Sequence, residues 1–316
     1  MKYVPLGDSG IVVSQLCFGS LTVGPLQANL PVEEGAEVIS YAFSRGINFI
    51  DTAQYYENYR YIKLTDDIII SSKTYAYNRA QAIDAVEEAR RELNRDSKRD
   101  YVDIFMLHEQ ESIHTLRGHM EALEYLFEAK EKGIIRAVGV SMHHVAAVEG
   151  VCELKKRGYP INCIHPIYNM LGIGIADGTV SEMVCAMTKA KDLGIGIFSM
   201  KPLAGGHLYN RAAEAFDFVL ACNAIASVAV GMQSIAEVDA NINYFESLEK
   251  MAFDNLNKVK RRLFIENYCS GCGNCVKRCG QRALRIKDSQ AQVDIDRCVL
   301  CGYCAKVCEL FAIKVL

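Results

Sequence analysis

The last fifty residues contain the feature that most restricts how this chain can fold. Eight cysteines occur there in two runs of the pattern C-x₂-C-x₂-C-x₃-C, and each member of the first run recurs 29 residues later. Such a concentration of closely spaced thiols is typical of metal ligation and not of a disulfide framework. The eight cysteines are Cys269, Cys272, Cys275, Cys279, Cys298, Cys301, Cys304 and Cys308.

This spacing resembles that of bacterial two-cluster ferredoxins, in which the fourth cysteine of each run binds the other cluster. A structural zinc site is the alternative, but zinc usually takes paired C-x₂-C knuckles without a third cysteine at the same step. Gly280 and Glu309 follow the fourth cysteines, where the family usually has proline. The resemblance implies two [4Fe-4S] clusters, one held by Cys269, Cys272, Cys275 and Cys308 and the other by Cys298, Cys301, Cys304 and Cys279.

Charge divides the chain into two parts. The 61 residues 256–316 hold 12 Lys/Arg and 5 Asp/Glu, a net charge of +7, which leaves −10 for residues 1–255. Two different domains are the simplest explanation. We therefore expect one domain over residues 1–255, a second, α+β ferredoxin-like domain over residues 256–316, and a basic linker helix at 249–264.

Residues 1–255 alternate amphipathic stretches with short apolar runs. Four of the amphipathic stretches end at a glycine that leads into an apolar run, which is typical of a helix followed by a strand. Eight uninterrupted apolar runs in about 250 residues predict a parallel (β/α)₈ barrel, the TIM-barrel architecture. A doubly wound open sheet is the alternative, but FGSLTVG at 18–24 does not match its phosphate-binding fingerprint. The apolar runs lie near residues 14–19, 47–50, 68–72, 102–107, 135–140, 162–167, 195–199 and 226–231.

The composition excludes several classes of protein. Half of the residues are hydrophobic and the formal net charge is only −3, so the chain can bury a sizeable core. The uncharged, largely apolar stretch 218–236 is interrupted by polar residues, and the first ten residues lack the apolar core of a signal peptide. We therefore expect a cytoplasmic protein that binds neither membranes nor nucleic acid.

Chemically active side chains follow the apolar runs of the predicted barrel, where barrel enzymes place their catalytic groups. Asp51, Lys73 and His108 each stand at such a position, and Tyr56 lies five residues beyond Asp51. An ammonium held by a carboxylate can lower the pKa of a neighbouring tyrosine. These four residues therefore indicate a proton-transfer site.

At this point residues 1–250 resemble an aldo-keto reductase. The matching segments include the opening YVPLGDSGIVVSQLCFG, GINFIDTAQYYEN with the Asp and Tyr, IISSK with the Lys, and VDIFMLHEQ with the His. Together with the cysteine-rich tail, the chain is similar to the iron–sulfur-containing branch of that family. The resemblance implies that Tyr56 protonates the carbonyl, Lys73 lowers the pKa of Tyr56, Asp51 pairs with Lys73, and His108 orients the carbonyl. Tyr55 competes with Tyr56, but the family's spacing selects Tyr56.

The resemblance also implies a nicotinamide cofactor, NAD(H) or NADP(H). Ser141 is expected to bind the carboxamide, and Phe198 to stack on the nicotinamide ring. Glu237 occupies the position where relatives carry a basic residue for the 2′-phosphate, which favours NAD, while Lys201 restores a positive charge nearby. The full set of expected cofactor contacts is Ser141, His165, Phe198, Ser199, Lys201, Leu203, Gly231, Met232, Ser234, Glu237 and Asn241.

These expectations combine into one function. The chain is interpreted as an NAD(P)-dependent oxidoreductase that interconverts a small carbonyl compound and an alcohol, with two [4Fe-4S] clusters that exchange electrons with a redox partner protein. The alternative is an iron–sulfur electron-transfer protein whose barrel is a docking scaffold or a flavin-binding module. Substrate identity and oligomeric state are not readable from these residues.

Overall fold

A closed barrel of eight parallel strands forms the body of the protein. The computed structural model describes residues 1–95, 97, 99–247, 253 and 261–316. The strands follow the order β10-β3-β4-β5-β6-β7-β8-β9 around the barrel, as the apolar runs predict, so the open-sheet alternative is wrong. They are β3 (Leu16–Gly19), β4 (Phe49–Asp51), β5 (Ile69–Thr74), β6 (Val102–Gln110), β7 (Ile135–Met142), β8 (Cys163–Pro166), β9 (Gly196–Met200) and β10 (Ser227–Gly231).

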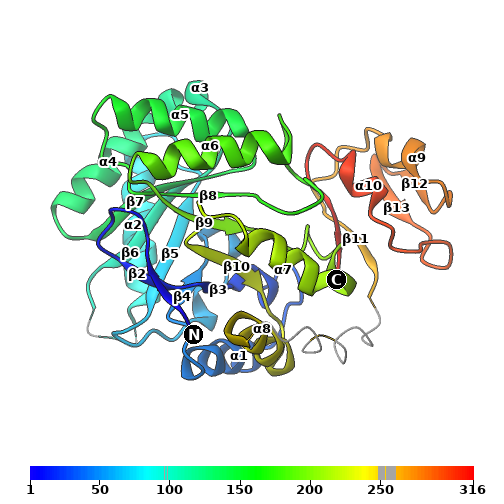
Figure 1. Ribbon diagram of the computed structural model, residues 1–316, viewed down its shortest axis with the longest axis horizontal. Helices are drawn as coiled ribbons and strands as arrows, with labels where there is room; N and C mark the ends of the chain where they lie inside the picture. Colours follow the sequence, from blue (N-terminus) through cyan, green and yellow to red (C-terminus); the bar gives the residue numbers. More distant parts are fainter. Residues whose placement is uncertain (96, 98, 248–252, 254–260) are drawn as a thin grey trace.

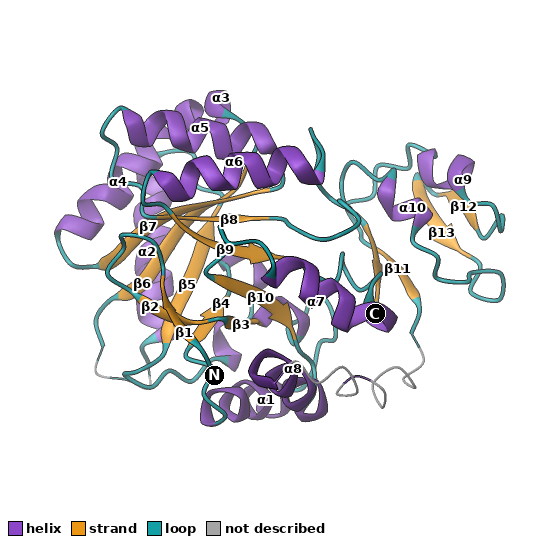
Figure 2. Cartoon of the chain, viewed as in Figure 1, coloured by secondary structure: helices purple, strands orange, loops and turns teal. Residues whose placement is uncertain are grey.

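Helices surround the barrel, as Figures 1 and 2 show. Their buried faces consist mostly of Ala, Val, Leu and Met, which pack on the outer faces of the strands. Among the described residues no helix is long and apolar enough to cross a membrane. The helices are α1 (Val32–Ser44), α2 (Arg79–Leu93), α3 (Ile113–Gly118), α4 (Met120–Glu131), α5 (Val145–Lys156), α6 (Val180–Asp192), α7 (Ala212–Leu220) and α8 (Ile235–Ser247).

Local signals in the sequence set where these elements begin and end. The four helix-to-strand glycines, Gly46, Gly133, Gly158 and Gly194, all have positive φ. The connection after β4 is short, as its length requires, and contains only the 3₁₀ turns η2 (Gln54–Tyr56) and η3 (Tyr59–Tyr61).

The barrel is a packed core and not a channel. Apolar side chains from alternate positions of the strands fill its interior, among them Phe49, Met106 and Phe198. The hairpin of β1 (Tyr3–Pro5) and β2 (Val12–Ser14) covers one end and adds Leu6 and Val13 to the same cluster. The opposite, C-terminal end of the strands is therefore the end left for a site.

The cysteine-rich tail forms a small α+β domain beside the barrel (Figure 1). It contains two antiparallel strand pairs, β11 with β14 and β12 with β13. The predicted boundary at residues 255 and 256 and most of the predicted helix 249–264 lie outside the described residues. Residues 263 and 264 are in a strand, so the helix prediction is wrong there. The elements are β11 (Leu263–Ile265), α9 (Asn274–Arg278), β12 (Leu284–Lys287), β13 (Gln290–Val293), α10 (Tyr303–Lys306) and β14 (Ile313–Val315).

Strand β14 joins the tail domain to the barrel. The backbone N–H of Val315 donates to the carbonyl of Gly205, in the loop after β9, and the His207 ring contacts the carbonyl of Ile313 through Nε2. A Cβ on Gly206 would lie 2.0 Å from the carbonyl oxygen of Val315, so only glycine permits this approach. The tail domain is thereby held against the C-terminal end of the barrel.

Candidate active site

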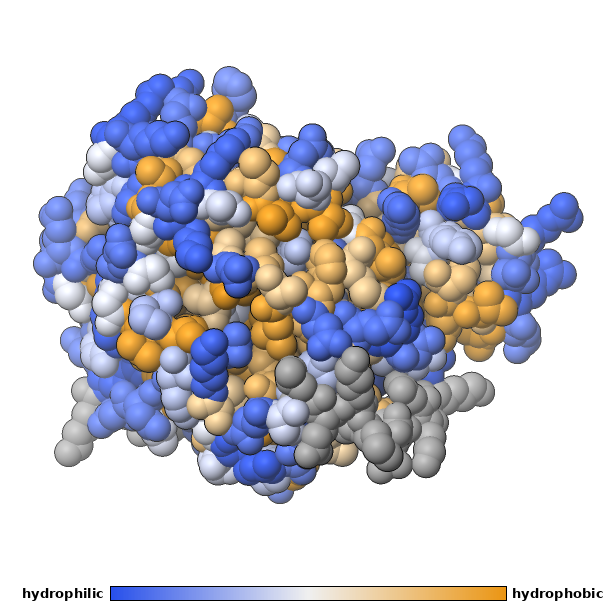
Figure 3. Space-filling view, in the orientation of Figure 1, coloured by the Kyte–Doolittle hydropathy of each residue, from blue (hydrophilic) through white to orange (hydrophobic). Residues whose placement is uncertain are grey.

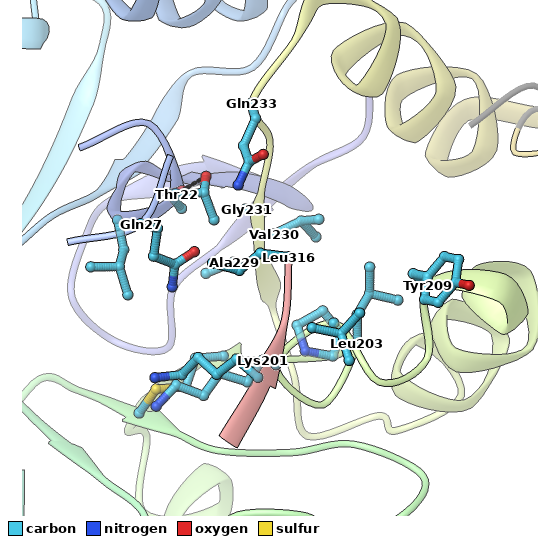
Figure 4. Close-up of a pocket in the computed structure, with 18 of the residues that line it drawn as sticks. Thr22, Gln27, Lys201, Leu203, Tyr209, Ala229, Val230, Gly231, Gln233 and Leu316 are labelled. Carbon is cyan, nitrogen blue, oxygen red and sulfur yellow. Dashed lines mark hydrogen bonds between the residues drawn. The ribbon is translucent and has the colours of Figure 1, made fainter. Parts of the chain in front are cut away.

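A cavity of about 200 Å³ opens at the C-terminal end of the barrel (Figure 4). Asp51, Tyr56 and His165 line it, and so do Glu237 and Asn241 of α8. Figure 4 shows the strand segment Ala229, Val230 and Gly231 running through this region between the side chains that line it. The cavity wall therefore includes both titratable residues at the barrel mouth and residues of α8.

Asp51 and Lys73 form a buried ion pair below the cavity. Lys73 Nζ donates to Asp51 Oδ2 at 2.8 Å and to the carbonyl of Thr52 at 2.7 Å. His165 Nε2 lies 3.5 Å from the same carboxylate oxygen, across the barrel mouth. Burial alone would raise the pKa of Asp51, but the charges of Lys73 and His165 outweigh it and hold that pKa below its ordinary value. Asp51 is thus a fixed anion that orients two neighbours.

Tyr56 lies over this pair, since Lys73 Nζ is 5.1 Å from the centre of its ring. Burial, followed by the negative charge of Asp51, raises the pKa of Tyr56 well above its ordinary value. The net direction of this shift is opposite to the lowering expected from Lys73. Tyr56 keeps its proton over the physiological pH range, and a neutral hydroxyl can donate a hydrogen bond and a proton.

His108 is the fourth member of the predicted group. Its ring stacks on Tyr75 with 4.4 Å between the ring centres and meets Tyr56 edge-on at 5.7 Å. Burial, with the Lys73 ammonium nearby, lowers the pKa of His108 to about 3. His108 is consequently neutral and can donate one ring N–H to a ligand. The structure brings together all four residues that the sequence singled out.

The expected cofactor contacts divide into two groups. The residues that line the cavity are His165, Lys201, Leu203, Gly231, Glu237 and Asn241. Ser141, Phe198, Ser199, Met232 and Ser234 do not line it. Ser141 Oγ accepts a hydrogen bond from the backbone N–H of Glu109, and Ser234 Oγ accepts one from Glu237 at the start of α8.

Phe198 lies one layer too deep to cover a ligand in the cavity. It is fully buried inside the barrel, and its ring stacks on His165 with 4.1 Å between the ring centres. Met200, two residues later on the same face of β9, lines the cavity instead. The expected stacking role of Phe198 therefore has no support from its position, and Met200 is a residue that sequence reasoning missed.

The far end of the cavity has a charged pair that the sequence did not reveal. Glu237 accepts a hydrogen bond from the N–H of Gln233 and pairs with Arg261 at 3.2 Å. Among the described residues, Asn241 Oδ1 and Arg261 Nε are buried without a hydrogen-bond partner, and so is Asp51 Oδ1 at the catalytic end. These unpaired buried polar atoms belong to residues that line the cavity, so the cavity suits a ligand with polar groups.

The eight cysteines surround two cavities in the tail domain. Cys269, Cys272, Cys275 and Cys308, the first cysteine set, line one cavity. The second cysteine set, Cys279, Cys298, Cys301 and Cys304, lines the other. Each set contains the crossed fourth cysteine that the ferredoxin resemblance implies.

Backbone N–H groups point at three of the sulfur atoms. Ala283 N donates to Cys279, Ala291 N to Cys269 and Ala312 N to Cys308, at 3.3–3.5 Å. In the part of the chain that the structure describes, no three metal-binding side chains converge as a site for a single ion. Thiolates arranged around a cavity, with N–H donors to sulfur, suit a multi-atom cluster.

Family comparison assigns the barrel. Residues 15–219, more than half of the chain, match the Aldo/keto reductase family. The chain belongs to the aldo-keto reductase family. In this reductase, residues 268–312 also match a 4Fe-4S dicluster domain, which covers all eight cysteines of the tail.

Relatives of this aldo-keto reductase are distant. It is 24% identical to L-galactose dehydrogenase of Arabidopsis thaliana, a match that covers 79% of this chain and 89% of that one. Over 54 residues it is 46% identical to a probable aldo-keto reductase of Glycine max, which covers 17% of this chain and 16% of that one. An aldo-keto reductase from Bacillus halodurans in its holo form shares the fold, with a TM-score of 0.63 and 23% identity over 81% of this chain and 96% of that one.

The tail domain contributes part of the wall of the reductase's cavity. No sequence motif predicted this contribution. Phe311, Lys314, Val315 and Leu316 line the cavity beside the loop that follows β9. Tyr268, directly before the first cysteine of the tail, is one of the groups whose charge affects Tyr56. A contact between the loop at 201–206 and residues more than 100 positions later leaves no local pattern in a single sequence.

Proposed function

We propose that this aldo-keto reductase interconverts a carbonyl compound and an alcohol with NAD(H) or NADP(H). The observation that carries the proposal is the placement of Tyr56 over the buried Lys73–Asp51 pair, at the end of a cavity that continues to α8. A relative named as a dehydrogenase of a sugar supports this reaction class.

Each residue of the site has a separate role in proton transfer. A nicotinamide, when bound, supplies or accepts the hydride. Tyr56 donates its proton to the carbonyl oxygen as that oxygen gains negative charge, and Lys73 stabilises the phenolate that results. His108, which is neutral, holds the carbonyl oxygen by an N–H donor. Asp51 holds Lys73 in place, and its own lowered pKa keeps it ionised throughout.

The tail domain is proposed to hold two [4Fe-4S] clusters, one in each cysteine set. The two lined cavities and the N–H donors to sulfur support this proposal. The +7 charge of residues 256–316 partly cancels the charge of the thiolates, which favours the addition of electrons. An acidic electron-carrier protein is the expected redox partner.

The outer surface of the tail domain is suited to such a partner. Cys301 of the second cysteine set is exposed, and the large apolar residues Val299 and Tyr303 on either side of it are 62% and 57% exposed. Arg278 lies over the ring of Tyr303. Figure 3 shows apolar side chains on this domain next to projecting hydrophilic ones.

The test is an anaerobic assay of the purified protein with NADH and NADPH against a panel of aldehydes, ketones and sugars. Oxidation of the nicotinamide that depends on the carbonyl compound is the expected result. A panel with no such turnover, from protein whose visible spectrum shows that its clusters are present, would contradict the proposed reaction.

A further inference from the structure

Lys201 occupies an unusual position at the mouth of the barrel. It directly follows β9, and its φ of 58° is in the left-handed region. Its Nζ lies 2.7 Å from Nε2 of His143, which directly follows β7. Because β8 lies between β7 and β9 in the barrel, the side chain reaches back over β8, away from β10 and α8. The ammonium therefore lies on the side of β9 that faces β7, and Figure 4 shows the Lys201 side chain among those that line the cavity.

The Lys201 ammonium has no carboxylate within ion-pair distance among the described residues, although carboxylates are near. The Glu109 carboxylate accepts a hydrogen bond from Tyr75 at 2.6 Å and lies 3.8 Å from His143. Glu266 pairs with Lys314 at 2.6 Å. The nearby acids are thus engaged by other groups, and a partly buried cation without a paired anion is stabilised when a ligand supplies one.

Lys314, from the tail domain, adds a second positive charge close by. The ring of Phe311 lies under both ammonium groups, 4.5 Å from Lys201 Nζ and 5.4 Å from Lys314 Nζ. Both lysines line the same cavity as Tyr56. Lys314 is held in position by Glu266 and by the hydroxyl of Tyr268 at 3.0 Å. The mouth therefore presents the Lys201 ammonium, which contacts neutral His143 and no paired carboxylate among the described residues, beside the ion-paired ammonium of Lys314.

We propose that Lys201, supported by the charge of Lys314, binds an anion, and that this anion is a carboxylate of the carbonyl substrate. The inference rests on the proposed carbonyl reduction and names its substrate class as oxo acids and aldehydic acids. A coenzyme phosphate is the other source of an anion. The direction of the Lys201 side chain favours the substrate, because the nucleotide end of the cavity, at Glu237 and Asn241, lies on the other side of β9.

The experiment compares acids with their own methyl esters, which differ in charge at one group. Glyoxylate, pyruvate and succinic semialdehyde, each with its methyl ester, are assayed anaerobically with the intact protein. The variants are Lys201→Met, which keeps the length of the side chain, and Lys201→Arg, which keeps the charge. Lys132→Met is the matched control, because Lys132 directly follows α4, is exposed and does not line the cavity. Equilibrium titrations with the same compounds and with reduced coenzyme register binding whether or not turnover occurs.

We expect wild type to prefer the acids, and Lys201→Met to lower kcat/KM for the acids by about 10- to 100-fold, the value of one hydrogen bond to a charged group. The esters should change little, Lys201→Arg should retain part of the preference, and Lys132→Met should match wild type.

Three outcomes separate the hypotheses. If wild type binds and reduces acids and esters equally well, the carboxylate site is overturned. Reduction of the esters in that case still supports the proposed carbonyl reduction. An effect of Lys201→Met on coenzyme affinity alone assigns the anion to the coenzyme and overturns the substrate assignment. Acid binding that depends on Lys201, without any turnover, supports the anion site and contradicts the proposed function.

Discussion

Tyr56 and Tyr55 are adjacent in the sequence but differ in position. Tyr56 lines the cavity, whereas Tyr55 is 52% exposed. We predict that Tyr56→Phe lowers kcat for carbonyl reduction by about 10²- to 10⁴-fold, the usual contribution of a general acid. Coenzyme affinity should be unchanged, because the hydroxyl acts only in the chemical step. Steady-state kinetics and a fluorescence titration of reduced coenzyme measure the two quantities.

Tyr55→Phe is the matched control, since it removes the same atom one position earlier. It should retain nearly full activity. An inactive Tyr55→Phe protein with an active Tyr56→Phe protein would mean that the catalytic tyrosine has been misassigned by one residue.

Lys201 should give the reaction a dependence on pH. Burial lowers the pKa of Lys201 to about 7; Glu109 and Glu266 act to raise that pKa, and Lys314 and Lys73 act to lower it. The hydrogen-bonded His143 is itself kept neutral, because burial lowers its pKa. The ammonium is therefore lost as pH rises through about 7, so kcat/KM for glyoxylate should fall above that pH.

The pH profile of glyoxylate reduction measures this effect, with the methyl ester and Lys201→Arg as controls. The ester should not show the fall, and an arginine, which stays charged, should remove it for the acid. Parallel profiles for acid and ester would assign the fall to another group.

The place of a single residue could be predicted where its position at the end of a strand is enough to put its side chain at the barrel mouth. Asp51, Lys73 and His108 follow apolar runs, and the structure gathers them at one end of the barrel. The sequence pattern does not show how deep in the barrel a side chain lies. It therefore points to Phe198, whereas the structure has Met200 beside the cavity. The pKa of Tyr56 was also expected to shift the other way, because its burial is not visible in the sequence.

At the scale of elements, the first turn of α8 contributes Glu237 to the cavity, where we propose that the coenzyme ribose binds. Glu237 there accepts the N–H of Gln233 and pairs with Arg261. We predict that Glu237→Arg shifts the ratio of kcat/KM values toward NADPH by about 10- to 100-fold, because two arginines would then face a 2′-phosphate. Glu237→Gln, which removes the charge without reversing it, should give a smaller shift. An unchanged preference in both variants would show that Glu237 does not face the ribose.

The contact of the loop after β9 with β14 can be tested with a pair of glycines. Gly206 and Gly133 have φ of 88° and 72°, but only Gly206 faces another backbone, since nothing lies within 4 Å of a Cβ at Gly133. Gly133→Ala should lower the free energy of unfolding by about 1–2 kcal/mol through backbone strain alone. Gly206→Ala should cost more and should also weaken the binding of reduced coenzyme, because β14 must move.

Chemical denaturation and a coenzyme titration of both variants measure these effects. Equal losses of stability with unchanged coenzyme affinity would show that the position of β14 has no influence on the cavity.

Helices and strands could be predicted where the same local sequence pattern recurs along the chain. Each barrel strand lies within or at the edge of an apolar run, and the glycines before β4, β7, β8 and β9 mark helix ends. Strand β14 has only three residues, Ile313–Val315, and is defined by pairing with β11 across the whole tail domain. A strand of that kind depends on distant partners, so no window of sequence predicts it.

At the scale of the whole molecule, the hydride transfer proposed for the barrel and the clusters proposed for the tail domain move different numbers of electrons. A hydride carries two electrons, whereas each [4Fe-4S] cluster accepts one, and a nicotinamide radical is too unstable to divide the pair readily. We predict that reduced coenzyme alone bleaches the cluster absorbance slowly or not at all, while dithionite bleaches it quickly. Anaerobic stopped-flow spectra of the intact protein, without added flavin, provide the measurement. Cluster reduction by reduced coenzyme within one turnover would make the tail domain an obligate part of catalysis.

The docking of β14 against the barrel has a consequence for how the protein matures. All eight barrel strands precede the tail domain in the chain, so a ribosome completes them before any of the cysteines is made. The wall formed by Phe311, Lys314 and Val315 can therefore close the cavity only after the tail domain has been made. We therefore expect a newly made barrel to have an incomplete cavity wall until the tail domain folds against it, so that oxygen damage to the proposed clusters would also impair the reductase.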